Sequence, residues 1–275
     1  MRAAVELATL LLQVVLVFAV AFIYANLGLG GGLLFVPILL STGVTDNAVA
    51  VPISLSLTIA TAASSVINHY RRGLVDFRLG RSLVAGALVG AVIGTLFTIY
   101  FLDKRTFTAF FIVILVVFGT YMLRDWVRNA RDVDRDDDTK LTLHRLAAVN
   151  AATLGSGFLS GSMGIGGGLL NVPLLVYGLG RKTRKAIGTS SLLIIPTAAV
   201  GFAAYLVSHA LRGGFALPAD FILIPILFPV VFVGAYLGSR WGLQALRTRP
   251  IALIFILLLF IAAAKLVYDL LTMPR

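Results

Sequence analysis

The sequence predicts an all-α protein that crosses a membrane many times, and three observations lead to this fold class. Of the 275 residues, 59% are hydrophobic and only 13% are charged, which is about half the charged share of a soluble domain. The mean hydropathy is +0.98. Long apolar stretches recur along the chain, and one glycine-rich phrase occurs twice. A water-soluble fold of this length cannot bury so much apolar surface, so lipid must be the main solvent.

Eight apolar stretches are long enough for a transmembrane helix, which needs about 20 residues. They lie at roughly 5–26, 47–68, 80–102, 106–124, 142–163, 185–209, 218–240 and 250–271. The first is longer than the core of a typical signal peptide, so we expect a span rather than a cleaved leader. Two shorter apolar pieces, at about 32–42 and 168–178, could each rise only about 16 Å as a helix. We expect these two to be half-helices or re-entrant segments packed inside the protein.

The chain contains an internal repeat. Residues 28–40 read GLGGGLLFVPILL and residues 164–176 read GIGGGLLNVPLLV, with nine of the thirteen positions identical at an offset of 136. Further matches follow in the same order, with HYRRG and HALRG at an offset of 140, and Gly90 and Gly94 matching Gly234 and Gly238 at 144. We therefore expect a first repeat at 1–124, a polar linker at 125–141 and a second repeat at 142–275.

The basic residues favour an inverted pair of repeats. The loop at 41–48 has no basic residue and the loop at 69–81 has four, whereas the equivalent loops at 180–186 and 208–220 have four and one. Since basic loops face the cytoplasm, this reversed bias predicts opposite orientations for the two halves. Both termini would then lie outside and the linker inside. Four spans in each half, without the short segments, would instead make the halves parallel.

Charge and residue usage exclude several function classes. The net charge of +11 comes from short basic clusters between apolar runs, which is typical of loops at an anionic membrane surface and does not indicate nucleic-acid binding. The chain has no cysteine. The predicted spans hold almost no ionisable side chain away from their ends, so neither a carboxylate proton relay, a metal site nor an enzyme active centre is expected. We expect no cofactor, and the partners would be a small anionic substrate and the lipid bilayer.

What the interior offers is backbone amides and hydroxyl groups. Glycines that open short helices allow a ligand to approach unpaired N–H groups at the positive end of a helix dipole, which is a site for a small oxyanion. Hydroxyl and amide side chains on the adjacent segments add hydrogen-bond donors. The predicted substrate-binding residues are Gly30, Gly31, Gly32, Gly166, Gly167, Gly168, Asn171, Ser54, Thr189, Ser190 and Ser191.

Several of these residues also have a purely structural interpretation. Glycines let membrane helices pack closely, and Gly86, Gly90 and Gly94 are expected to be such a packing stripe. Ser54 and Ser190 could each bond a carbonyl of their own helix. The prolines Pro37 and Pro173 are expected to end or kink the short helices. Two His–Arg pairs lie at matching span ends, where histidines cap helices and arginines anchor them at the interface. A gate is the alternative hypothesis for these four residues: His69, Arg72, His209 and Arg212.

The doubled Gly-x-Gly-Gly-Gly phrase with a proline five residues later, followed by AVPIS or AIGTSS, resembles the TauE/SafE family of sulfite and organosulfonate exporters. The resemblance runs from about residue 5 to 271. It implies a multi-pass permease of the cell membrane for small sulfur-containing oxyanions. The second half keeps the family phrase more closely, so polar contacts are expected there, and Phe35 facing Asn171 in the alignment agrees with this. The alternatives are an anion channel, a transporter of another small carboxylate or inorganic anion, and a structural subunit. The anion, direction, coupling ion and oligomeric state are open.

Overall fold

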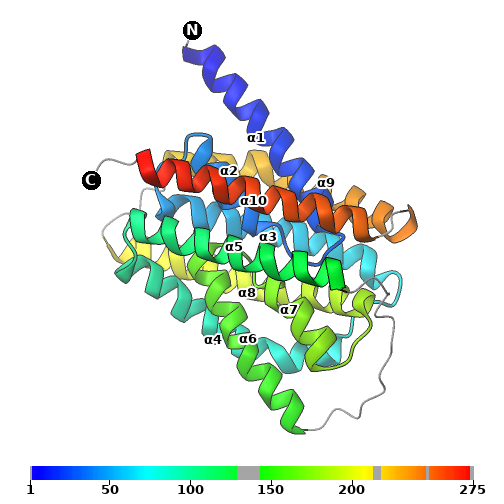
Figure 1. Ribbon diagram of the computed structural model, residues 1–275. Coiled ribbons are helices and arrows are strands. Elements are labelled where there is room, and N and C mark those ends of the chain that lie inside the picture. Colours follow the sequence, from blue (N-terminus) through cyan, green and yellow to red (C-terminus); the bar gives the residue numbers. More distant parts are fainter. Residues whose placement is uncertain (1, 129–142, 213–217, 246–247, 273–275) are drawn as a thin grey trace.

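All regular secondary structure in the part of the chain that the structure describes is helical. The computed structural model describes residues 2–128, 143–212, 218–245 and 248–272 (Figure 1). The first half contains α1 (Arg2–Tyr24), α2 (Gly32–Ser41), α3 (Asn47–Tyr70), α4 (Phe77–Phe101) and α5 (Lys104–Arg128). The second contains α6 (Leu143–Met163), α7 (Gly168–Pro173), the π-helical turn η1 (Leu174–Gly178), α8 (Thr183–Leu211), the 3₁₀ turn η2 (Ala219–Ile222), α9 (Leu223–Ala245) and α10 (Thr248–Thr272). Most of the predicted linker lies outside the described residues, and α5 reaches into its beginning.

Six of the described helices are long and apolar enough to cross a membrane, which confirms a polytopic membrane protein. The predicted stretches at 142–163 and 250–271 are also helices, α6 and α10, but they are not among those six. The count of eight spans therefore stays a prediction. The two predicted short segments form apolar helices of less than full length, at Gly32–Ser41 and Gly168–Gly178.

The two prolines of the short helices act differently. Helix α2 continues past Pro37 to Ser41, so this proline does not end the helix. Pro173 is the last residue of α7, and the next five residues follow the wider π-helical pattern. A proline removes one backbone donor from the ladder, which agrees with a local change of hydrogen-bond spacing after Pro173.

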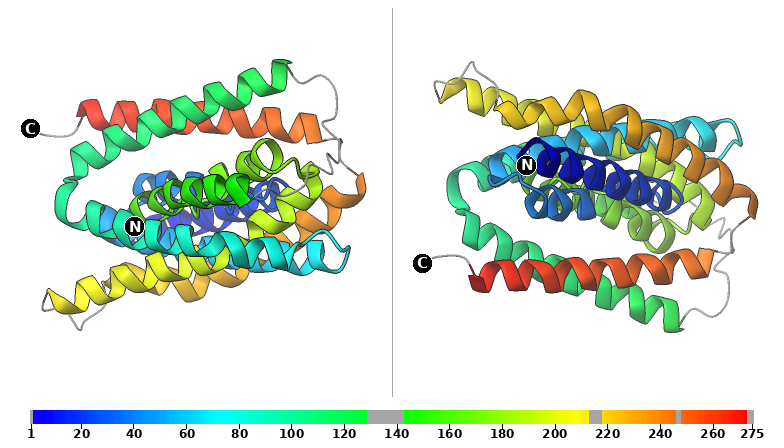
Figure 2. Two further views of the ribbon diagram at one scale, coloured as in Figure 1. Left: turned by 90° about the horizontal axis from the view of Figure 1, so that it is seen from below. Right: turned by 90° about the horizontal axis from the view of Figure 1, so that it is seen from above.

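Helix α3 lies in the interior of the bundle, where it packs against α2, α8 and α9. Helix α8 packs against α3, α4 and α7, and Figure 2 shows it on the side of the bundle opposite α5 and α10. The apolar window of α3 is 78% buried, far more than that of any other candidate span. This explains why α3 carries many small and hydroxyl side chains, because helices packed on all sides need close approach and internal hydrogen bonds.

The other extensive contacts join the remaining long helices two by two. Helix α4 packs against α6, and α1 packs against α9. Helices α5 and α10 pack together, and Figure 2 shows them as a separate layer in which they run in opposite directions. In the repeat predicted from the sequence, α4 corresponds to α9 and α6 to α1. Each of these packings therefore has a counterpart in the other half.

Glycines make the α4–α6 and α1–α9 contacts close. A Cβ on Gly90 would overlap the carbonyl oxygen of Leu154, and one on Gly94 would overlap that of Phe158. On the other pair of helices, a Cβ on Gly238 would overlap the carbonyl oxygen of Phe22. The predicted packing role of Gly90 and Gly94 is confirmed, and Gly238 has the same role, since any side chain would separate the backbones.

Candidate functional site

The two glycine-rich segments, residues 28–32 and 164–168, have the same backbone conformation. Three glycines in each segment have positive φ angles: Gly28 (67°), Gly30 (80°) and Gly31 (92°), and Gly164 (71°), Gly166 (83°) and Gly167 (76°). Residues with a Cβ rarely adopt this region, so the repeated glycines are needed to turn the chain. Gly31 and Gly167 are the N-caps of α2 and α7.

These two segments cross in direct backbone contact at the centre of the protein. A Cβ on Gly32 would overlap the carbonyl oxygen of Gly164, and a Cβ on Gly168 would lie 2.6 Å from the carbonyl oxygen of Gly28. All ten residues of the two segments are buried. The structure therefore brings the six predicted glycines together, although 136 positions separate the two copies. We call this place the glycine crossing.

Two of the predicted serines hold the glycine crossing together. Ser54 Oγ on α3 donates to the carbonyl oxygen of Gly164 at 2.9 Å, and Ser190 Oγ on α8 donates to that of Gly28 at 2.8 Å. Each serine therefore binds the glycine segment of the opposite half, not a carbonyl of its own helix. Because a hydroxyl has one hydrogen, neither serine keeps a donor for a ligand, though both oxygens can still accept.

The sequence reasoning missed Thr58, which lies in the middle of α3 at the glycine crossing. A Cβ on Gly30 would lie 2.9 Å from Thr58 Cγ2, and one on Gly166 would overlap the same methyl group. The side chain is 0% exposed, and its Oγ1 has no hydrogen-bond partner in the part of the chain that the structure describes. The repeat offset of 136 pairs Thr58 with Ile194, which touches the same two glycines. The signal that could have identified Thr58 is its alignment with an apolar residue, Ile194, at the repeat offset.

Asn171 and Ser156 form a polar pair beside the second glycine segment. Ser156 Oγ lies 2.7 Å from the carbonyl oxygen of Gly167 and 2.6 Å from Asn171 Oδ1. The Nδ2 atom of Asn171 is buried without a partner among the described residues. Since Ser156 has a single hydrogen, one polar atom of the Asn171 amide lacks a partner in either orientation of that amide.

The other two predicted polar residues lie elsewhere along α8. Thr189 Oγ1 accepts from the backbone N–H of Asp76, at 3.1 Å, in the turn before α4. Ser191 Oγ donates to the carbonyl oxygen of Ile187 in its own helix and lies 3.2 Å from Ser65 Oγ of α3. These contacts connect α8 with its neighbours, and the structure does not bring either side chain to the glycines.

The four proposed gate residues have different surroundings. His69 is 1% exposed, and its Nδ1 lies 2.8 Å from the carbonyl oxygen of Ser65, so it satisfies a carbonyl near the end of α3. Arg212 donates to the carbonyl oxygen of Ile99 at 3.1 Å, and its guanidinium lies 4.7 Å from the ring centroid of Tyr100. This contact ties the end of α8 to the end of α4. Arg72 is exposed.

His209 lines a pocket of about 110 Å³, which also includes Asp46, Pro52, Tyr205 and Pro218. The corresponding place in the other half is closed, because a Cβ on Gly188 would overlap the carbonyl oxygen of Leu74. The repeat offset pairs Gly188 with Pro52. The two ends of the α3–α8 pair therefore differ, because backbone contact closes one end and the other end contains a pocket.

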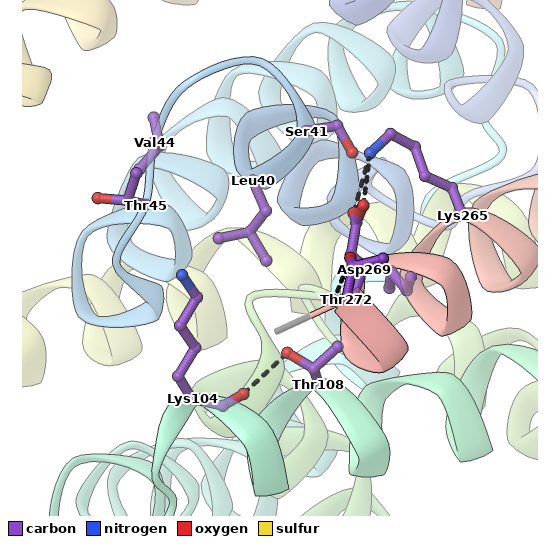
Figure 3. A pocket seen from close by; sticks show the side chains of 10 residues that line it. Leu40, Ser41, Val44, Thr45, Lys104, Thr108, Lys265, Asp269 and Thr272 are labelled. Atoms are coloured by element: carbon purple, nitrogen blue, oxygen red, sulfur yellow. Dashed lines mark hydrogen bonds and ion pairs between the residues drawn. The ribbon is translucent and has the colours of Figure 1, made fainter. Parts of the chain in front are cut away.

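A larger pocket of about 350 Å³ lies away from the glycine crossing, where α2 ends, α5 begins and α10 ends (Figure 3). Its polar side chains include Lys104 and the ion pair of Lys265 with Asp269, whose atoms are 2.9 Å apart. None of the predicted substrate-binding residues lines it. Among the described residues, no group of three or more His, Asp or Glu side chains could hold a metal ion.

The helices and the buried glycine crossing define the class of this protein as a multi-pass membrane protein with two half-length helices in its interior. The family described as Sulfite exporter TauE/SafE matches residues 13–266, and the chain belongs to this family. The predicted resemblance is thereby confirmed.

The relatives agree with this membership. The chain is 27% identical to the probable membrane transporter protein YunE of Bacillus subtilis, over 88% of this chain and 92% of that one. It is 31% identical to a probable membrane transporter protein of Xylella fastidiosa, over 64% and 66%, and 24% identical to one of Methanocaldococcus jannaschii, over 85% of each chain. No solved structure matches. These names indicate a membrane transporter rather than an enzyme, located in the cell membrane.

Proposed function

We propose that this transporter is a permease for small sulfur-containing oxyanions, such as sulfite or organosulfonates, and that it binds them at the glycine crossing near the middle of the bilayer. The observation that carries this proposal is the crossing itself. Two glycine segments with positive φ angles meet in the protein interior, and polar atoms without partners lie beside them.

The chemistry of this place suits an anion. The first-turn amides of α2 and α7 have no carbonyl one turn earlier within their own helices, and the positive ends of both helix dipoles lie at the glycines. In the structure, neighbouring protein atoms fill the space beside these glycines, such as the methyl group of Thr58 at Gly30 and Gly166, so we propose that an anion reaches the backbone amides by displacing them. Secondary transporters commonly bind substrates at such discontinuous helices, where irregular backbone inside the membrane is buried in protein.

The proposal includes two inverted repeats, with both termini outside and the linker inside. The opposite directions of α5 and α10 support this arrangement (Figure 2), as do the matching packings of α4 with α6 and of α1 with α9. The reciprocal bonds of Ser54 and Ser190 to the opposite glycine segments also follow the offset of 136. In an inverted pair, the two segments would enter from opposite faces and frame one site.

The substrate class comes from the family, whose description names a sulfite exporter, whereas the relatives are named only as probable membrane transporters. The partners proposed for this chain are accordingly a small anion and the lipid bilayer, with no nucleic acid and no cofactor. The binding residues proposed are those of the crossing, with Asn171 contributing a polar group in the second half.

Transport by purified protein in liposomes tests this function. We expect saturable flux of sulfite or an organosulfonate, and counterflow when the unlabelled anion is placed on the opposite side. Flux that never saturates and shows no counterflow would indicate an anion channel instead. If sulfite, sulfoacetate and thiosulfate neither move nor stabilise the protein, the substrate proposal is wrong.

A further inference from the structure

The interior of this protein contains polar groups but no described charged side chain that could neutralise an anion. The buried polar residues in the described part of the chain are Gln, Asn, Ser, Thr and one His, without any Asp, Glu, Lys or Arg. The histidine, His69, lies near the end of α3 and is bonded to the carbonyl oxygen of Ser65. An anion at the glycine crossing would therefore be held by dipoles alone.

Two side chains at the crossing have unused hydrogen-bonding capacity. The hydroxyl of Thr58 is fully buried and has no partner among the described residues, while its methyl group touches the glycines of both halves. The Asn171 side-chain amide is 1% exposed and keeps one unpaired polar atom next to the second segment. Buried hydroxyl and amide groups without partners are unfavourable unless a ligand or water satisfies them.

The neutrality of this site determines which anions it can hold. The attraction between an ion and fixed dipoles increases in proportion to the charge of the ion. The free energy lost on leaving water increases with the square of that charge, and a dianion therefore loses about four times as much as a monoanion of the same size. Without a cation in the site, doubling the charge of the anion therefore increases the free energy of leaving water more than it increases the attraction to the dipoles.

We infer that the glycine crossing selects an oxyanion head with a single negative charge, such as a sulfonate or hydrogensulfite, over a doubly charged head such as sulfite or sulfate. Thr58 is the specificity-determining residue of the first half, donating its hydroxyl hydrogen to the anion, and Asn171 supplies the second neutral donor. This inference rests on the proposed function, because it concerns the same site.

Binding to the purified full chain tests the charge selection, with methanesulfonate as the singly charged probe and sulfate as the doubly charged one. We expect methanesulfonate to bind at least about tenfold more tightly. Sulfite provides an internal test, because raising the pH converts hydrogensulfite into the dianion. The apparent affinity for sulfite is expected to fall with pH while that for methanesulfonate stays constant, which also controls for titration of His69.

Thr58→Val removes the hydroxyl and keeps the shape, and we expect it to weaken methanesulfonate binding about tenfold, as for a lost hydrogen bond to a charged group. Thr58→Ser keeps the hydroxyl and should retain binding. The matched control is Thr61→Val, because Thr61 lies one turn away on α3, is equally buried, and already donates to the carbonyl oxygen of Leu57 at 3.0 Å. That control is expected to bind like the unmodified protein.

The outcomes separate the two levels of the argument. Equal binding of sulfate and methanesulfonate would overturn the charge selection, and unchanged binding by Thr58→Val would overturn the role of Thr58; either result leaves a sulfur-oxyanion permease intact. If neither methanesulfonate nor sulfite binds or moves under any condition, the proposed function fails, and the inference fails with it.

Discussion

The two glycine segments share a backbone but differ in the side chains around them. Both have the same three positive φ angles and a serine bond from the opposite half. Next to the first segment, however, Phe35 lies against Gly31, whereas Asn171 and Ser156 occupy the corresponding side of the second. The backbone conformation is thus preserved where the segments support each other, and polarity is confined to one side. The crossing therefore has a symmetric frame, which is the glycine backbone with the bonds of Ser54 and Ser190, and an asymmetric lining, which is Phe35 on one side and Asn171 with Ser156 on the other.

The largest expected effect comes from breaking the frame itself. Gly32→Ala places a methyl group on the carbonyl oxygen of Gly164, so the two backbones must separate. We expect the free energy of unfolding to fall by about 3 kcal/mol, which is the upper end for overpacking, and little folded protein to remain after purification. Gly155→Ala on α6 is the matched control, because its Cβ would meet no atom within 4 Å. Equal thermal stability of the two variants in detergent would contradict the crossing.

The next comparison asks whether the two halves support each other equally. Ser54→Ala and Ser190→Ala each remove a buried hydrogen bond to the opposite segment, and both should lower the free energy of unfolding by about 1 kcal/mol. Ser56→Ala on α3 is the control, because its buried hydroxyl donates to the carbonyl oxygen of Ile53 within its own helix at 2.7 Å. A shift in melting temperature for only one of the two serine variants would mean that the frame is not symmetric.

Changes in the lining are expected to affect transport, whereas changes in the frame are expected to affect folding. Asn171→Leu removes the polar group with little change in size, and we expect about tenfold weaker uptake of the anion in liposomes with nearly normal stability. Phe35→Leu at the equivalent position should retain the affinity and lower the stability by about 1 kcal/mol. Equal affinities for the two variants would remove the functional difference between the halves.

The smallest effect is expected at the closed end of the α3–α8 pair, where the start of α8 meets the turn before α4. Arg181 lies 3.6 Å from Asp76, and both side chains are partly exposed, at 27% and 32%. Asp76→Asn removes the ion pair but keeps an acceptor for the N–H of Leu79 at the start of α4. We expect a change below about 0.5 kcal/mol in the unfolding free energy, because exposed pairs contribute little. A loss as large as that of Ser54→Ala would show that this contact closes the end of the bundle.

Local patterns in the chain were enough to predict much of this protein. Hydropathy predicted the membrane class, and the glycine runs predicted two short helices that begin at Gly32 and Gly168. These predictions hold because apolar length and positive φ angles are properties of short stretches. The contacts of the hydroxyl groups were not predictable. Thr189 binds the turn before α4, and Thr58 was missed, because a side chain's partner depends on which distant segment lies beside it.

By itself, the sequence determined the solvent of this protein, its family and its repeated glycine phrase. The tertiary structure alone decided that the two phrases touch, that Ser54 and Ser190 bind across the halves, and that Thr58 lies between them. The physical reason is that lipid supplies no hydrophobic drive for one helix pairing over another. The choice of partners then depends on close packing and hydrogen bonds, which exist only once distant helices have come together.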